Sequence, residues 1–316
     1  MKIESRDDVR FLMAAYVPSA ALNTALELGL FWRLAEEPQD AGRVAEALGI
    51  PLNRCQYWLD LLGSLGLLEE GSAGYTPSPG AQTAILDEYS QETWALLAQE
   101  ARERQPAVHD LARHIHEPRS GWAALGLTPL DYYAMLEEDP DRARRFTHML
   151  YEFHQPLAVE VAKTLDMSGV ERLMDLGGGS GVISLALLRR HAHLASVVVD
   201  FPKVCAVGRE IAAENGMEER LTYHAANFLE DELPSGFDMV LECDVGIFHK
   251  ALFRKLHAVL SPGGRFVIVD DLIEDEGEVA PADLRWAFLR SLGDPDYRMG
   301  SWAEIEAQLS QAGFEP

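Results

Sequence analysis

The segment 175–181, which reads DLGGGSG, holds the residues of this sequence best suited to binding a ligand. Glycine lets the backbone turn sharply and lets a ligand approach without meeting a Cβ atom. Dinucleotide enzymes also use a glycine-rich turn, so the glycines alone leave a dehydrogenase as a rival. Two residues separate the cases: Val182 stands where dinucleotide spacing requires a glycine, and Asp175 precedes the loop. A carboxylate there would repel a pyrophosphate but attract the ammonium and sulfonium of S-adenosylmethionine, which we expect as the cofactor.

Residues that follow later strands are expected to complete the cofactor site. Asp200 ends the second strand, where a carboxylate can accept hydrogen bonds from both ribose hydroxyls, although a solvated strand end is the alternative. After the third strand, the Asn227 amide suits the adenine amino group and the Phe228 ring suits the face of the base. The expected cofactor-binding residues are Asp175, Gly177, Gly179, Gly181, Asp200, Phe201, Asn227, Phe228 and Cys243.

The elements around these residues alternate between strand and helix from Val170 onward. Strands are expected at 172–176, 196–200, 221–225, 237–242 and 265–270, and helices at 182–190, 204–215 and 252–260. This alternation predicts right-handed crossovers and an α/β fold, a doubly wound, mostly parallel, Rossmann-like sheet. Ligands of such sheets bind at the carboxyl ends of the strands, where the polar residues above fall. We expect the cofactor-binding domain to span 166–316.

Residues 1–165 are expected to form a helical domain with one small hairpin. Two helices, ending near Gly49 and Leu65, precede short strands at 67–71 and 74–77, which is the layout of a winged helix. DNA binding is disfavoured because Arg54 is the single cation of the would-be recognition helix, whose Tyr57 and Trp58 suit burial against another protein chain. A ligand-sensing DNA-binding regulator is the alternative of a different class.

Composition restricts the partners further. The formal net charge of −24 argues against nucleic acid, whose binding relies on Lys and Arg. No apolar run approaches the roughly 20 residues needed to cross a bilayer, and the amino terminus lacks the apolar core of a secretory signal. Cys55, Cys205 and Cys243 are scattered without metal-ligand spacing, so we expect no metal, a cytoplasmic setting and a small-molecule partner.

Five segments together resemble a known family: LELGLF at 26–31, DLGGGSG at 175–181, VDFPKV at 199–204, LSPGGR at 260–265 and QAGF at 311–314. The second half looks like a class I S-adenosylmethionine methyltransferase. Over nearly its full length the chain resembles the small-molecule O-methyltransferases typified by the plant caffeate and the bacterial polyketide and phenazine enzymes. The resemblance implies methyl transfer to an oxygen of a small aromatic or polyketide-like acceptor. It also implies a homodimer built by the helical domain, which helps to close the substrate site.

The catalytic base is where the family pattern fails. The family typically places Val-Leu-His-Asp-Trp after the fourth strand, whereas residues 242–250 here read ECDVGIFHK. The family histidine falls on Ile247 without gaps and on His249 after a shift of two, so His249 is the candidate general base, with a helix-start cap as the alternative. Asp271 matches a family position where an acidic side chain orients the base. If neither serves, catalysis would rest on proximity and alignment alone.

The acceptor site is expected to involve Asp244 and, at the domain junction, His148, Tyr151 and His154, with surface or packing roles as the alternative for the last three. The altered motif leaves N- or C-methylation, or a reaction other than methylation, open. The family would enter a final strand pair after 311–314, so we expect the sheet to lack its antiparallel edge.

Overall fold

The computed structural model describes residues 2–126, 134, 136, 138–273, 279–281 and 283–315. The chain divides into two compact units, Met1–His109 and Asp110–Pro316. This division differs from the boundary expected near residue 165. The reason is that two helices before that point, Pro140–Phe153 and Gln155–Thr164, pack against helices of the second unit.

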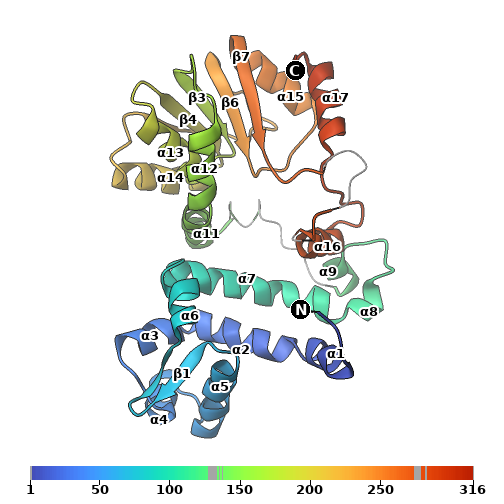
Figure 1. Ribbon diagram of the computed structural model, residues 1–316. Helices are drawn as coiled ribbons and strands as arrows, with labels where there is room; N and C mark the ends of the chain where they lie inside the picture. Colours follow the sequence, from blue (N-terminus) through green and yellow to red (C-terminus); the bar gives the residue numbers. More distant parts are fainter. Residues whose placement is uncertain are drawn as a thin grey trace. The chain divides into compact units, whose positions relative to one another are not determined.

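The first unit is helical apart from one hairpin (Figure 1). Its elements are α1 (Arg6–Met13), α2 (Tyr16–Glu27), α3 (Leu30–Glu36), α4 (Ala41–Leu48), α5 (Leu52–Ser64), β1 (Leu68–Gly71), β2 (Gly74–Pro77), α6 (Pro79–Ala81), η1 (Gln82–Leu86) and α7 (Gln91–His109). Asp40 begins α4 by accepting a hydrogen bond from the Arg43 N–H, and Gly49 ends it with φ of 65°. Phe31 and Leu59 are fully buried in the core of this unit. The predicted helix, turn, helix and hairpin are therefore present.

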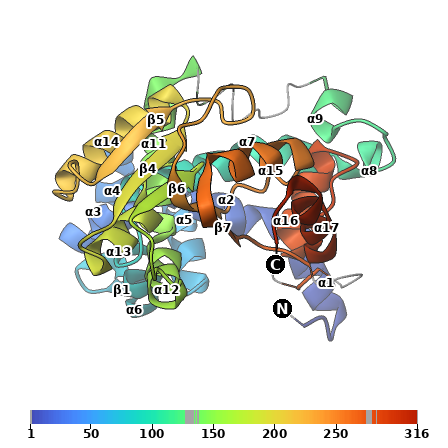
Figure 2. The ribbon, with the colours of Figure 1, turned by 90° about the horizontal axis from the view of Figure 1, so that it is seen from above.

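The second unit is built on a parallel sheet with helices on both faces (Figures 1 and 2). Its elements are α8 (Leu111–His114), α9 (Gly121–Ala124), α11 (Pro140–Phe153), α12 (Gln155–Thr164), β3 (Arg172–Leu176), α13 (Val182–Arg190), β4 (Ala195–Asp200), α14 (Pro202–Glu214), β5 (Leu221–Ala225), β6 (Phe237–Cys243), α15 (Lys250–Val259), β7 (Leu260–Val269), α16 (Leu284–Gly293) and α17 (Trp302–Ala312).

The sheet of the second unit has the strand order β5-β4-β3-β6-β7, and every pairing in it is parallel. The chain runs outward from β3 to β5, then returns to place β6 on the other side of β3. The strand order therefore reverses between β3 and β6, and this is where open sheets of this class form their ligand crevice. The predicted α/β fold class is confirmed, and β3 and α13 have the predicted bounds.

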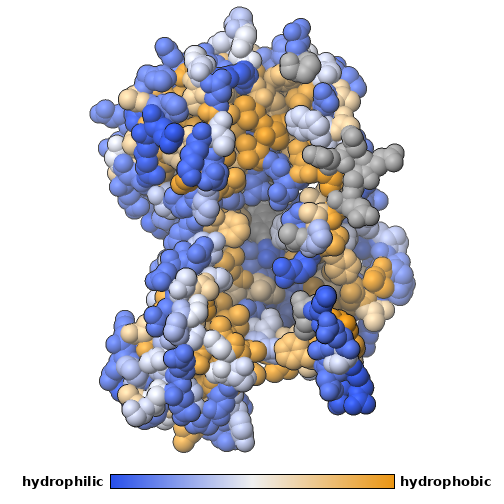
Figure 3. All heavy atoms as spheres, viewed as in Figure 1, coloured by the Kyte–Doolittle hydropathy of each residue, from blue (hydrophilic) through white to orange (hydrophobic). Residues whose placement is uncertain are grey.

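Two cores form because successive residues of a strand point to opposite faces of the sheet. In β3, Leu173 packs with α12, α13 and α14, whereas Met174 packs with α15. By the same alternation Asp175 points toward α13. On the edge strand β7, Val267 and Val269 are only half-buried, and Figure 3 shows apolar side chains at the surface over β6 and β7. The inner strands β3 and β6, in contrast, carry core residues on both faces, so a site at their carboxyl ends has buried strands beneath it.

Candidate active site

The glycine loop joins β3 to α13 at the carboxyl edge of the sheet. Gly177, Gly179 and Gly181 have left-handed φ angles of 66°, 53° and 74°. A Cβ atom on Gly177 would lie 2.6 Å from the Val245 side chain, and one on Gly181 would lie 2.6 Å from the Tyr223 hydroxyl oxygen. A Cβ on Gly179 would meet only a backbone oxygen at 4.0 Å. Packing therefore requires glycine at 177 and 181, while Gly179 faces open space that a ligand can enter.

Asp175, which precedes this loop in the sequence, lies beneath it. It is fully buried, its Oδ2 accepts a 2.6 Å hydrogen bond from Ser184 Oγ, and its carboxyl carbon lies where a Cβ on Gly178 would be 2.4 Å away. Its Oδ1 has no hydrogen-bond partner among the described residues. Burial raises the pKa of this carboxyl to about 6. A cation above the loop would stabilise the charged form, because the low dielectric of the interior transmits the attraction.

Asp200, at the end of β4, holds the loop from the other side. Its Oδ2 accepts a 2.9 Å hydrogen bond from the Gly179 N–H, and its Oδ1 accepts one of 2.7 Å from the Phe201 N–H. Burial raises the pKa of Asp200 to about 6 even though both hydrogen bonds lower it. Each carboxylate oxygen can accept a second bond, so the predicted bonds to ribose hydroxyls fit beside those already present.

The two residues expected beside adenine have structural partners of their own. Asn227 Oδ1 accepts a 3.1 Å hydrogen bond from the Leu229 N–H, which leaves one lone pair for a further donor. Phe228 is 6% exposed and packs with the core residues Phe237 and Leu256 on the α15 face. Most of the ring is thus committed to the core, and its predicted contact with the base stays a prediction.

The end of β6 carries a buried acid that sequence reasoning missed. Glu242 is 1% exposed, and its Oε1 accepts hydrogen bonds from the N–H groups of Val245 at 3.0 Å and Gly246 at 3.1 Å. Its Oε2 has no partner among the described residues. Burial and the neighbouring Asp270 raise the pKa of Glu242 to about 8. The adjacent Cys243, a predicted cofactor contact, is half-buried, and burial raises the pKa of its thiol, so it stays protonated.

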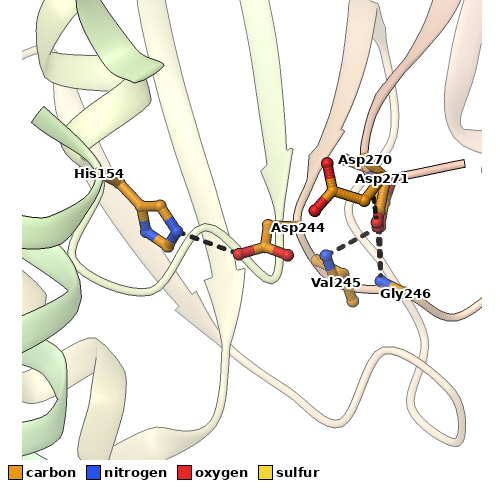
Figure 4. Close-up of polar contacts among 7 residues, drawn as sticks. His154, Asp244, Val245, Gly246, Asp270 and Asp271 are labelled. Carbon is orange, nitrogen blue, oxygen red and sulfur yellow. Dashed lines mark hydrogen bonds and ion pairs between the residues drawn. The ribbon is translucent and has the colours of Figure 1, made fainter. Parts of the chain in front are cut away.

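Two predicted acceptor-site residues meet just beyond β6. Asp244 Oδ2 lies 3.0 Å from Nε2 of His154, which stands between α11 and α12, and Figure 4 shows the two side chains directed at each other. The Asp270 carboxylate lies on the other side of the loop, where its Oδ2 accepts a 3.0 Å hydrogen bond from the Gly246 N–H. The sheet edge therefore brings together His154 and three carboxylates, those of Asp244, Asp270 and Asp271 (Figure 4).

Two cavities lie within the second unit, and the three carboxylates line one of them. The first has a volume of about 400 Å³, and its lining includes Asp244, Asp270, Asp271, Trp286 and Tyr297. The second has a volume of about 600 Å³, shares Tyr297 with the first and is more apolar, with Ile273, Val279 and Met299 in its wall. Together they offer a small aromatic molecule an apolar wall and a carboxylate-rich end beside the glycine loop.

The predicted catalytic pair is not brought together by any hydrogen bond or ion pair among the described residues. His249 is exposed, and its Nδ1 accepts a 3.1 Å hydrogen bond from the Leu252 N–H, so it caps α15 as the alternative interpretation had it. It lines neither cavity, whereas Asp271 lines the smaller one. His148 and Tyr151 are half-buried on α11 and line neither cavity, and the Tyr151 hydroxyl bonds Asn215 at 3.4 Å.

Sequence reasoning missed Ser184, Glu242 and Asp270. The alternation of side chains along a strand places Asp175 on one face of the sheet. Which helix covers that face depends on the direction of the connection after β3, so the contact of Asp175 with Ser184 of α13 was not predicted. Glu242 and Asp270 stand at the ends of predicted strands, which is the signal that could have identified them.

Comparisons with known proteins agree with this geometry. Residues 108–315 match the O-methyltransferase domain family, and residues 11–86 match the O-methyltransferase dimerisation domain. The chain is 31% identical to the N,N-dimethyltransferase OxyT of Streptomyces rimosus, over 96% of this chain and 89% of that protein. It is 30% identical to 3-hydroxy-5-methyl-1-naphthoate 3-O-methyltransferase of Streptomyces sahachiroi, over 92% and 84%.

Among solved structures, human N-acetylserotonin methyltransferase in complex with SAM superposes with a TM-score of 0.80 at 19% identity, over 100% of this chain and 94% of that one. This likeness supports the fold. The family recognised from the five sequence segments is thereby confirmed: the chain belongs to the O-methyltransferase family.

Proposed function

We propose that this chain is an S-adenosylmethionine-dependent methyltransferase that acts on an oxygen of a small aromatic or polyketide-like molecule. The observation that carries the proposal is a pair of carboxylates, the buried Asp175 and the half-buried Asp200, placed below and beside the open face of Gly179. Two acids there favour a ligand that is both cationic and a nucleoside. Membership of the O-methyltransferase family supports the reaction class.

The roles of the cofactor residues follow from the same geometry. Gly179 gives the ligand access to the loop backbone, Asp200 accepts from the ribose hydroxyls, and Asp175 favours the positive charges from below. Phe201, Asn227, Phe228 and Cys243 border this edge from the ends of β4, β5 and β6.

When bound, S-adenosylmethionine supplies a methyl group attached to a positively charged sulfur. An acceptor oxygen can bond to the methyl carbon, with the sulfur as the leaving group. The chain's residues then have to hold the acceptor in line with that methyl group and accept its proton. The cavity lined by Asp244, Asp271 and Trp286 lies beside the glycine loop, since Val245 of its wall packs against Gly177. An acceptor in this cavity would therefore be close to the methyl group.

Calorimetry with S-adenosylmethionine, its demethylated product and NAD tests the cofactor. We expect binding of the first two and none of NAD, and the opposite result would overturn the proposal. Methyl transfer is then measured with radiolabelled cofactor and a panel of phenols headed by 3-hydroxy-5-methyl-1-naphthoate, the substrate named for the Streptomyces sahachiroi relative.

N-methylation is the second candidate, and a specific observation favours it. The smaller cavity is lined by five acidic residues against two arginines, namely Asp244, Asp270, Asp271, Asp283 and Glu304 against Arg290 and Arg298. This excess of negative charge suits an acceptor that carries an amine. The relative OxyT is an N,N-dimethyltransferase. Radiolabel transferred to aromatic amines, and not to phenols, would favour this candidate.

The first unit is proposed to form a homodimer. It includes the whole stretch that matches the dimerisation domain, and α1 and α2 expose Phe11, Leu12, Met13 and Tyr16, whose exposed fractions are 54%, 56%, 75% and 61%. Sedimentation equilibrium should give twice the mass of the 35.0 kDa chain. No helix in the described ranges combines the length and apolar character that a bilayer crossing needs. A cytoplasmic location stays a prediction from the scattered cysteines, which are free in the structure.

A further inference from the structure

One arginine in the wall of the smaller cavity is held by two aromatic rings. The guanidinium carbon of Arg290 lies 5.3 Å from the ring centroid of Tyr297 and 5.8 Å from that of Trp286. A guanidinium within about 6 Å of a ring centroid is attracted by the negative face of the ring. All three residues line this cavity. The two ring contacts therefore hold the cation at a defined place in the cavity wall.

The sequence around α16 builds this arrangement. Trp286 and Arg290 are four positions apart, so they share one face of the helix. Leu292 is buried on the opposite side of the helix, and α16 packs against α9 (Figure 1). After the helix ends, the Tyr297 N–H donates a 3.0 Å hydrogen bond to the Asp294 carbonyl oxygen, which closes a tight turn. This turn brings the Tyr297 ring back to the guanidinium.

The guanidinium of Arg290 makes no hydrogen bond or ion pair with any residue in the described ranges. Five acidic residues line the same cavity, yet none of them pairs with it. Contact with a ring face attracts the charge but leaves the five N–H donors available to an oxygen acceptor. Because these donors form a planar fork, the ligand that matches them best is a carboxylate with two parallel hydrogen bonds.

Four of the acidic residues stand at the other end of the cavity. Asp244, Asp270 and Asp271 directly follow β6 and β7 at the edge of the sheet. Asp283 caps the start of α16, and burial followed by the charge of Asp283 raises the pKa of Asp271, so these two carboxylates are neighbours. Arg290 stands seven residues after Asp283, about 10 Å further along the helix axis. The cavity therefore has a negative end at the sheet edge and a cation about two helical turns away.

We propose that Arg290 is a specificity-determining residue that binds a carboxylate of the acceptor, an inference that rests on the proposed function. The acceptor class is then an aromatic carboxylate that carries its reacting hydroxyl or amine at the other end. Asp270 and Asp271 repel the acceptor's carboxylate from the sheet edge, while Arg290 attracts it. The hydroxyl or amine is thereby directed toward the glycine loop. Trp286 and Tyr297 are positioning residues for the guanidinium.

The first test measures binding and does not depend on turnover. The full chain, saturated with S-adenosylhomocysteine, is titrated by calorimetry with matched pairs of probes. Each pair is an aromatic carboxylate and its neutral methyl ester, with a hydroxyl or an amine on one, two or three fused rings. The series includes 3-hydroxy-5-methyl-1-naphthoate. We expect the carboxylate of at least one pair to bind about tenfold or more tightly than its ester. If no carboxylate binds more tightly than its ester, the proposal is overturned.

Variants assign the preference to one side chain. Arg290→Gln should weaken binding of the carboxylate by about 10- to 100-fold and leave binding of the ester within about twofold. Arg290→Lys keeps the charge without the planar fork and should recover part of the loss. The matched control is Arg285→Gln, the same change at an exposed arginine of α16 that lines neither cavity, and it should keep the full preference.

Two other outcomes would contradict the role of Arg290. If Arg290→Gln weakens the carboxylate and the ester equally, the side chain only shapes the cavity wall. If Arg298→Gln removes the preference while Arg290→Gln keeps it, the other arginine of the cavity binds the carboxylate. Tyr297→Leu tests the ring contacts, and it should reduce the preference several-fold because the guanidinium is no longer held.

Turnover separates this inference from the proposed function. With radiolabelled S-adenosylmethionine, Arg290→Gln should raise KM for the carboxylate acceptor far more than it lowers kcat. Equal kcat/KM for the two members of every pair in the natural chain would overturn the carboxylate site and leave methyl transfer intact. A binding preference for the carboxylate without transfer of label to any acceptor would support the site and refute the proposed function.

Discussion

Ser184 Oγ lies 2.6 Å from Asp175 Oδ2 and 2.8 Å from Ser196 Oγ, so one hydroxyl of α13 connects β3 to β4 inside the core. These hydrogen bonds anchor the buried carboxylate under the glycine loop. Ser184→Ala should lower the free energy of unfolding by about 1–3 kcal/mol, because the buried acid loses its donor. Urea unfolding followed by circular dichroism measures this. The matched control is Ser310→Ala, at an exposed serine of α17, which should stay within about 0.5 kcal/mol of the natural chain. Equal stability of the two variants would contradict the role of Ser184.

The raised pKa of Asp175 predicts a pH dependence with a definite sign. Its folded value of about 6 lies above the ordinary 3.8, so between these values the folded state binds more protons than the unfolded state. The contribution of Asp175 to stability therefore falls as the pH rises from about 4 to about 6, by up to about 3 kcal/mol, and is level above that range.

Asp175→Asn removes the cost of burying a charged carboxylate. The variant should therefore be more stable than the natural chain but bind the cofactor less tightly. We expect the variant to exceed the natural chain in unfolding free energy by more at about pH 8 than at about pH 5. Its affinity for S-adenosylmethionine should fall by about tenfold or more, because the negative charge below the loop is gone. A variant that binds the cofactor as tightly as the natural chain would exclude a role for the Asp175 charge in cofactor binding.

Much of the fold was predictable because the local patterns were strong. The strand at 172–176 and the helix at 182–190 have the predicted bounds, since a buried apolar run, glycines and a largely apolar helix follow one another without ambiguity. The direction of Asp175 was not predictable. The alternation of side chains along the strand places Asp175 and Leu176 on opposite faces of the sheet. Which of the two faces α13 covers depends on the direction of the connection after β3.

The contact of His154 with Asp244 could not be predicted from spacing. One residue lies between two helices and the other follows a strand 90 positions later, so only the packing of α11 against α14 and of α12 against α13 brings them together. For His249 the family alignment suggested a base. Its place directly before Lys250, the first residue of α15, is the position of an N-cap, and the structure uses it so.

Asp200 should matter to the cofactor through two separate sets of hydrogen bonds. Asp200→Ala removes the acceptors of the Gly179 and Phe201 N–H groups as well as the expected ribose contacts. We expect the affinity for S-adenosylmethionine to fall by about 1.5–3 kcal/mol. Asp200→Asn keeps one acceptor oxygen and should recover part of the loss. Calorimetry measures both variants, and an unchanged affinity in the alanine variant would exclude the ribose role.

His249 can be tested as a cap separately from any part in proton transfer. His249→Ala should cost about 0.5–2 kcal/mol of stability, because the Leu252 N–H loses its acceptor. His249→Asn, which supplies another good N-cap, should restore it. Thermal unfolding gives the stabilities, and methyl transfer by the asparagine variant gives the second readout. Loss of turnover in a fully stable asparagine variant would return His249 to the catalytic site.

The unpartnered Oε2 of Glu242 has a consequence for how ligand binding should be measured. With a pKa of about 8, this carboxyl is a neutral acid at physiological pH, although the formal charge of −24 counts it as ionised. A cation entering beside Asp270 favours the charged form, so it should expel this proton into the buffer. The heat of binding then includes the ionisation enthalpy of the buffer. Calorimetric titrations in two buffers of different ionisation enthalpy would therefore reveal the displaced proton. The number of protons released by Glu242 would report whether a bound ligand brings positive charge to this edge of the sheet.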